Sequence, residues 1–534
     1  MIKRVFYLFA TLLLLAGAPL PVSAADGFEQ AIVQLTERSF RTKETAIVSI
    51  AESGDERALP LLKRLLDGDV RYLRYARTVV YAEKAEGGYR ITEVLTGEEL
   101  GIKDRREAKR VVINNALRSV LRRQIASLSL NSDAPALRLA AVREMSGGLD
   151  DETASALEAR QQVESNATIR EAIDTALALR DLESEDKALR LAAIERLHGS
   201  LEPVATLRLH DLAEGEASAE VKQAAQNALK AIAFNRDLSG FGETLFFGLS
   251  LGSVLVLAAI GLAITFGVMG VINMAHGELI MLGAYTTYVV QQLMPNHIGL
   301  SILVSIPAAF LISALAGIAI ERGVIRHLYG RPLETLLATF GISLILQQTV
   351  RTIFSPLNRS VATPEFMSGA LEINSALTLT YNRLYVFAFC LLVFAALLFI
   401  LKKTPLGLQV RAVSQNRAMA RAMGVRSEWV DALTFGLGSG VAGVAGVALS
   451  QLTNVGPNLG QAYIIDSFMV VVFGGVGNLW GTLVAGLSLG VANKVLEPWS
   501  GAVLAKILVL AFIILFIQKR PRGLFPQKGR AAEG

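Results

Sequence analysis

Three polar side chains, Asn273, His276 and Glu278, follow directly after a long apolar stretch of the chain. An amide, an imidazole and a carboxylate so close in sequence can hydrogen-bond either a polar solute or a neighbouring helix. Polar groups at membrane depth are costly, so they usually face a pathway or a protein partner rather than lipid. We therefore predict that these three residues line or gate a pathway, with hydrogen bonding between helices as the equal alternative.

Four further polar residues are weaker candidates for the same pathway, namely Gln347, Gln348, Asn454 and Asp466. The sequence shows no nucleophile with a base and no set of metal ligands, and its only cysteine is Cys390. It therefore predicts neither an enzyme nor a bound metal or cofactor. A phosphate-binding loop with its lysine is also missing from the sequence, so the chain is not expected to bind or hydrolyse ATP itself.

The elements that position these residues follow from the hydrophobic pattern. Of the 534 residues, 52% are hydrophobic and 19% are charged, and the charge is concentrated before about residue 240. This split predicts two domains, the second an all-α, polytopic membrane domain over residues 243–526. Its nine predicted apolar segments cover residues 243–267, 276–294, 299–321, 333–354, 383–401, 431–453, 464–477, 479–496 and 501–517. The second and seventh segments are either spans or broken, re-entrant helices.

Basic residues in the links between these segments predict the orientation of the chain. Lys and Arg gather in links 322–332 and 402–430 and in the tail after residue 517, whereas links 291–298 and 454–463 have none. By the positive-inside rule, the basic links and the tail, including residues 527–534, should be cytoplasmic. Nine crossings then place the charged first domain on the outer side of a bacterial inner membrane.

The first residues have the pattern of a secretory signal peptide. Lys3 and Arg4 precede a short apolar core, and small residues lead up to Ala24. This pattern predicts a signal peptide over residues 1–25, with an uncleaved first transmembrane helix as the alternative. In both cases the next domain, residues 26–240, should lie in the periplasm.

This predicted periplasmic domain carries an internal repeat. Two segments, 136–145 and 169–177, recur at an offset of 52 residues. Two helices that recur at one offset predict a helix-pair solenoid similar to HEAT repeats, in which stacked units bury a shared apolar face. Two β-prone runs within residues 78–92 predict a small hairpin before the repeats.

Two features of the second domain concern contacts between helices and with partners. Glycines cluster within residues 436–446 and 474–481, which predicts close contact between helix backbones. The basic link contains a helix-prone run, residues 408–423, that Gly424 can stop. Its small residues suit contact with a partner, and a plain cytoplasmic loop without a partner is the alternative.

Several motifs within residues 243–526 together resemble one family. They are the stretch 248–288, the run 474–481, the tail 520–525 and the link 404–425, which is similar to the coupling loop of ATP-binding cassette (ABC) importer permeases. With these motifs, the chain resembles the LivH-like branch of the branched-chain amino acid and amide permeases. The resemblance implies a permease in the lipid bilayer that pairs with a second, homologous permease. It also implies two cytoplasmic ATPase subunits, which use the ATP, and a periplasmic substrate-binding protein.

The resemblance further implies how the link works. Closure of the ATPases would push on it and switch a bistable helix bundle between outward and inward access. The residues expected to carry this coupling are Gly407, Arg411, Ala412, Asn416, Ala420 and Gly424.

Within the family, a signal peptide followed by a helical extension resembles the urea permeases, and residues 89–101 and 137–141 are similar to that extension. This resemblance implies transport of urea or short amides. Amide and carboxylate side chains suit urea, but they also suit the backbone of an amino acid, so branched-chain amino acids are the alternative substrate. A passive channel or an ion-coupled carrier is a further alternative, although neither needs a link that docks ATPases.

Overall fold

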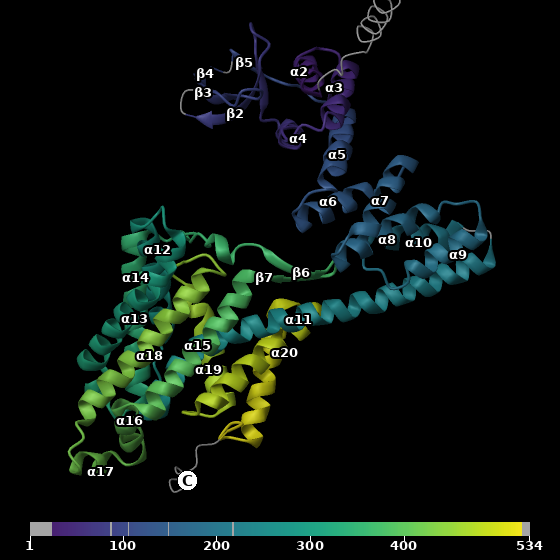
Figure 1. Cartoon of the computed structure of the whole chain (residues 1–534). Helices are drawn as coiled ribbons and strands as arrows, with labels where there is room; N and C mark the ends of the chain where they lie inside the picture. Colours follow the sequence, from purple (N-terminus) through teal and green to yellow (C-terminus); the bar gives the residue numbers. More distant parts are fainter. Residues whose placement is uncertain (1–23, 86–87, 105, 148, 216–217, 526–534) are drawn as a thin grey trace, which may run out of the picture. The chain divides into compact units, whose positions relative to one another are not determined.

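The computed structural model describes residues 24–85, 88–104, 106–147, 149–215 and 218–525. The chain divides into two compact units, Met1–Asn235 and Arg236–Gly534. Helices dominate both units, which confirms the predicted all-α class apart from two small sheets (Figure 1). The predicted tail 527–534 and all but the last two residues of the predicted signal peptide lie outside the described residues.

The first unit begins with three helices, α2 (Ala24–Gln34), α3 (Phe40–Glu52) and α4 (Ala58–Asp67), which share an apolar core with the start of α5 (Asn115–Ser129). In α4 the buried residues recur at helical spacing along one face, as Ala58, Leu61, Leu62 and Leu65. Gly68, with a left-handed φ of 86°, then ends the helix.

A sheet of five antiparallel strands follows, in the order β4-β3-β2-β1-β5. The strands are β1 (Val70–Leu73), β2 (Val79–Ala85), β3 (Gly88–Glu93), β4 (Glu99–Lys103) and β5 (Ala108–Arg110). The predicted hairpin is confirmed as β2 and β3, whose register pairs Ala82 with Ile91. The other three strands were not predicted because they are three to five residues long and carry charges that break the alternating apolar pattern.

The repeat in this unit has three helices in each period, which corrects the predicted helix pair. The first period holds α6 (Pro135–Met145), α7 (Asp151–Val163) and α8 (Ala167–Asp181). The second holds α9 (Lys187–Arg196), α10 (Pro203–Gly215) and the start of α11 (Ala219–Met269), each beginning 52 residues after its counterpart. The sequence did not predict the middle helices as repeats because their sequences differ, although both bury a leucine at the equivalent position, 157 or 209.

The second unit is a helical bundle that includes most of α11. Its other long helices are α12 (His276–Leu293), α13 (Ile298–Gly323), α14 (Pro332–Phe354), α15 (Tyr381–Lys403), α18 (Ser427–Ser450), α19 (Leu459–Gly474) and α20 (Leu479–Lys519). Six helices of the described chain are long and apolar enough to cross a membrane, namely α11, α13, α14, α15, α18 and α20. The two predicted segments after residue 478 are joined in α20, which is kinked at the non-helical Gly501. A hairpin of β6 (Ala370–Asn374) and β7 (Leu377–Thr380) precedes α15.

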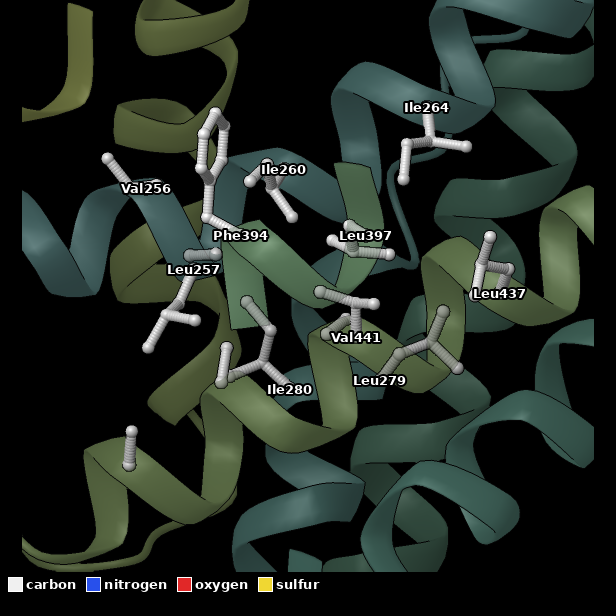
Figure 2. Packing of buried hydrophobic residues seen from close by; sticks show 14 of the residues in the cluster. Val256, Leu257, Ile260, Ile264, Leu279, Ile280, Phe394, Leu397, Leu437 and Val441 are labelled. Carbon is white, nitrogen blue, oxygen red and sulfur yellow. The ribbon is translucent and has the colours of Figure 1, made fainter. Parts of the chain in front are cut away.

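The most buried of the six spans is α18, with 94% of its apolar window inside the protein. A Cβ added to Gly283 of α12 would lie 2.0 Å from the carbonyl oxygen of Gly443, and one added to Gly261 of α11 would lie 2.2 Å from that of Gly438. These approaches confirm the predicted backbone contacts within residues 436–446. Figure 2 shows apolar side chains of the buried cluster to which these helices contribute, including Ile260, Ile280, Phe394 and Val441.

Candidate functional site

The chain turns back between α11 and α12. After Met269, Gly270 has a left-handed φ of 65°, and the residues up to Ala275 are not helical. The first residue of α12, His276, places its ring Nε2 2.8 Å from the carbonyl oxygen of Ala258. Since Ala258 lies about 16 Å before the end of α11, at 1.5 Å per residue, α12 begins well inside the apolar part of the bundle.

Glu278 lies in the first turn of α12, and its side chain is buried against α14. Its Oε1 accepts a hydrogen bond from Ser343 Oγ at 2.9 Å and another from Gln347 Nε2 at 2.7 Å. Its Oε2 has no hydrogen-bond partner among the described residues. Both donors are neutral, so no cation compensates the carboxylate. The two bonds hold the carboxylate in place, and its second oxygen can still accept from a further donor.

A polar stripe on α14 faces this region. Thr335, Thr339, Ser343 and Gln347 follow one another at intervals of four residues, and all are buried. This spacing places them on one face of the helix. The Oγ1 of Thr339 accepts the backbone N–H of Met274 at 3.1 Å, so the stripe also holds the turn-back segment. Sequence reasoning missed the stripe, although four-residue spacing of polar residues in an apolar helix was the signal that could have found it.

The other two residues of the predicted pathway hold local structure. His276 bonds α11, as the helix-to-helix alternative describes, and its ring lies close to Gly261. The Oδ1 of Asn273 accepts the backbone N–H of Ala275 at 3.0 Å. Within the described residues, the Nδ1 of His276 and the Nδ2 of Asn273 have no partner. Each of these buried side chains therefore keeps one polar atom whose hydrogen-bonding capacity the described residues leave unused.

The weaker candidates lie in different surroundings. Gln347 contacts Glu278, whereas its neighbour Gln348 is exposed. Asp466 of α19 lies 3.3 Å from the Nζ of a lysine in α20, and Asn454 is exposed. Of these four residues, only Gln347 joins the cluster around Glu278.

The coupling link forms two helices, α16 (Pro405–Gln415) and α17 (Arg417–Ala422). The expected single helix over residues 408–423 is therefore wrong. Asn416 interrupts it with an extended φ of −150°, and its side chain caps the start of α17. Asparagine side chains compete with the helical backbone in this way. Gly424, with a φ of 86°, ends the second helix as predicted.

The predicted coupling residues divide into packed and exposed groups. A Cβ added to Gly407 would lie 2.1 Å from the carbonyl oxygen of Leu401, so only glycine allows α16 to approach α15 this closely. Ala420 is buried and Ala412 is half-buried in the same apolar cluster. Arg411 is exposed and donates a hydrogen bond to the Leu401 carbonyl.

Three apolar side chains of the link are exposed. Leu408, Met419 and Met423 are 63%, 60% and 78% exposed. Methionine adapts its shape to a partner surface and is used at such contacts. These three residues, which sequence reasoning did not single out, lie in α16, in α17 and directly after it, and exposed polar residues such as Gln409 and Arg421 lie among them.

One partly buried ion pair joins the link to α18. The Nη1 and Nη2 of Arg417 donate to the two carboxylate oxygens of Asp431, each at 2.8 Å. The guanidinium also lies over the ring of Tyr329, 4.1 Å from its centroid. Such bidentate pairs fix geometry strongly. The pair was missed because its members are fourteen residues apart in separate helices, and no local pattern joins them.

Comparison with known proteins gives one consistent result. Residues 244–517 match a family model described as "Branched-chain amino acid transport system / permease component". The high-affinity branched-chain amino acid transport system permease protein BraD of Pseudomonas aeruginosa is 30% identical over 291 residues, which cover 53% of this chain and 94% of that protein. LivH of Escherichia coli K12 is 30% identical over 294 residues, covering 53% and 95%.

A more distant relative is the ribose import permease protein RbsC of Escherichia coli K12, 26% identical over 287 residues, covering 51% of this chain and 84% of that protein. No solved structure matches the chain. The matched family segment lies entirely within the second unit.

Proposed function

The chain belongs to the permease family of branched-chain amino acid transport systems, and from that membership we propose that it is the transmembrane permease subunit of an ABC importer. Its relatives are transport permeases and not enzymes. With six apolar helices it is a multi-pass inner membrane protein. The basic links 322–332 and 402–430 support a cytoplasmic C-terminus and a periplasmic first unit.

The observation that carries the proposal is the buried, half-bonded carboxylate of Glu278. It lies where α11 and α12 are interrupted, and interrupted helices near mid-membrane form the substrate sites of many transporters. Non-helical backbone is tolerated at such depth where it is covered by protein or lines a cavity. The Oε2 of Glu278 accepts from the solute, while the Nδ2 of Asn273 donates to it.

The second part of the proposal concerns partners. Two cytoplasmic ATPase subunits dock on the exposed apolar side chains of Leu408, Met419 and Met423, a periplasmic binding protein delivers the substrate, and a second homologous permease completes the pore. Movement of α17 reaches α18 through the pair of Arg417 and Asp431. From α18 it reaches α12, which carries Glu278, through the glycine contact with Gly443.

Substitution of Gly424 tests this coupling. Its φ of 86° is outside the range of proline, so Gly424→Pro should misplace the end of α17 and abolish ATP-driven uptake, with normal membrane insertion measured by immunoblotting. The matched control is Gly424→Asn, because asparagine tolerates left-handed backbone, and it should retain uptake. Normal uptake by the proline variant would contradict the coupling role.

For the substrate we propose urea or a short amide. A small neutral molecule with N–H donors and a carbonyl acceptor matches the two kinds of unpartnered atom in this region, the acceptor Oε2 of Glu278 and the donor Nδ2 of Asn273. The similarity of residues 89–101 and 137–141 to the extension of urea permeases supports the same substrate, although the first of these runs lies over β3 and β4 rather than in a helix.

Branched-chain amino acids are the second candidate, favoured by the names of BraD and LivH. One feature of the structure also suits them. The first turns of α12 and α19 touch, since a Cβ added to Gly277 would lie 2.6 Å from the carbonyl oxygen of Gly460. Helix N-termini carry partial positive charge, which favours a substrate carboxylate.

Uptake of labelled urea and labelled leucine, each at low concentration, in the native host with and without this gene, separates the two substrates. Loss of urea uptake alone supports urea. Loss of leucine uptake alone keeps the transporter class and overturns the urea assignment. Uptake that persists after ATP depletion would instead indicate a passive channel or an ion-coupled carrier.

A further inference from the structure

A cavity of about 520 Å³ lies at the end of α15 in the second unit. Its walls come from α11, α15, α16 and residues 477–480, and its apolar side is formed by Ile264, Val268, Leu398 and Leu401. Its size is within the range of small-molecule sites. It shares no residue with the cluster around Glu278, so it belongs to a different site.

Two cations line this cavity, and no acidic residue does. They are Lys402 at the end of α15 and Arg411 on α16, both exposed. Arg411 donates to the carbonyl of Leu401, and neither cation pairs with a carboxylate among the described residues. An apolar pocket with two uncompensated cations is complementary to a ligand that has an apolar body and an anionic group.

An indole ring places the cavity at a membrane interface. Trp480 lines it, is 51% exposed and packs edge-on against Phe394 with the ring centroids 5.1 Å apart. Tryptophan gathers where hydrocarbon meets headgroups. The neighbouring α15 is strongly apolar, buries only 22% of its most apolar stretch, and ends in two lysines. The cavity therefore lies where an apolar, outward-facing helix meets the polar link.

We propose that this cavity binds an anionic phospholipid. The acyl chains lie along Ile264, Val268 and Leu398, and the phosphate lies between Lys402 and Arg411. A zwitterionic lipid would bring its own ammonium group towards the same two cations, so the site prefers a headgroup with net negative charge. The bound phosphate joins α15 to α16 and so ties the link to the membrane. This inference goes beyond the proposed function and does not depend on the identity of the substrate.

Tryptophan fluorescence tests the proposal because the chain has only three tryptophans. With Trp429→Phe and Trp499→Phe, Trp480 reports alone from the full-length chain in phosphatidylcholine vesicles. A small fraction of the lipid is then replaced by phosphatidylglycerol or phosphatidylcholine with brominated acyl chains, which quench tryptophan on contact. Quenching should favour phosphatidylglycerol by about five-fold for each cation, which corresponds to about 1 kcal/mol per basic residue.

Two matched controls make the result specific. Lys402→Gln should remove most of the preference, whereas Lys403→Gln should keep it, because Lys403 does not line the cavity. A chain with Trp499 as its only tryptophan should be quenched equally by both lipids, since that ring is 90% exposed and outside the cavity.

Three results would overturn the proposal. Equal quenching of Trp480 by both brominated lipids would mean ordinary boundary lipid. An absence of quenching by either lipid would mean that protein covers the cavity. A preference that survives in the double variant Lys402→Gln and Arg411→Gln would mean that these cations do not hold the headgroup.

Discussion

Two buried carboxylates, one in each unit, differ in how fully the described residues hydrogen-bond their oxygens. Glu164 of the first unit accepts on both oxygens from Arg138, at 2.8 and 2.9 Å, and again from Arg160 at 2.9 Å. Glu278 of the second unit accepts on one oxygen only, from two neutral donors. A carboxylate whose charge and lone pairs are all matched has little left for a ligand. An unmatched one weakens the fold, and in a membrane segment it is the default candidate for a functional site.

Removal of Arg138, which pairs with the matched acid Glu164, should produce the largest loss of stability. Arg138→Ala strips Glu164 of its bidentate donor and leaves a buried carboxylate, which should destabilise the three-helix repeat by about 3–5 kcal/mol. Amide hydrogen exchange of α6 and α8 in the full chain measures this loss. Glu158→Ala, which removes an exposed pair with Arg180, should cost less than about 1 kcal/mol. Similar exchange in the two variants would contradict the structural role of Glu164.

Low pH should weaken the pair of Arg138 and Glu164 by less than Arg138→Ala does, because a protonated carboxyl still hydrogen-bonds. The guanidinium of Arg138 lowers the pKa of Glu164 from 4.5 to about 2, with help from the backbone N–H of Asn166 and from Arg160 and against the opposing effect of burial. Since the pKa in the folded chain is depressed, this stabilisation is complete above about pH 4.5 and is lost as the pH falls towards 2.

Thermal melting followed by circular dichroism, repeated at decreasing pH, tests this dependence. The melting temperature of wild type should approach that of Glu164→Gln between about pH 4.5 and pH 2. A difference between the two proteins that stays constant over this window would show that the charge of Glu164 contributes nothing.

Substitution of Glu278, the unmatched acid, should reduce uptake and leave stability unchanged, the reverse of what we expect at Glu164. Glu278→Gln keeps the shape of the side chain but removes its charge and one acceptor, so uptake should fall by about ten-fold, or about 1.4 kcal/mol, with no loss of thermal stability. Initial uptake rates in vesicles with equal amounts of inserted protein measure the effect. Glu334→Gln, at an exposed acid in the first turn of α14, should leave uptake unchanged. Unaltered uptake by Glu278→Gln would remove this residue from the pathway.

Features that depend on neighbouring residues could be predicted from the sequence, whereas contacts between distant segments could not. Long apolar runs predict membrane helices, and glycine clusters predict their contacts, because both effects act within a few turns of one helix. The strands β1, β4 and β5 were missed because short, charged strands gain their stability from neighbours in the sheet. The pair of Arg417 and Asp431 was missed for a similar reason, since only the fold brings its members together.

For Glu278, the sequence showed the unusual residue but not its contacts. Its unusual position in an apolar context was visible in the sequence, and so was the spacing of Thr335, Thr339, Ser343 and Gln347. The contact of this stripe with α12 depends on how two helices pack, and no local pattern determines that. Sequence reasoning therefore found the acid, and the structure identified the side chains that orient it.

The smallest expected effect on uptake, that of Gln347→Ala, separates the orientation of the Glu278 carboxylate from its charge. Gln347→Ala removes one of the two neutral donors that hold Glu278 while Ser343 remains, so uptake should fall by about five-fold, or about 1 kcal/mol. Gln348→Ala is the matched control on the exposed side of the same helix and should transport normally. If both variants transport normally while Glu278→Gln fails, the carboxylate acts through its charge and open oxygen alone. If Gln347→Ala fails as severely as Glu278→Gln, the carboxylate works only when α14 holds it in place, and the stripe belongs to the site as much as the acid does.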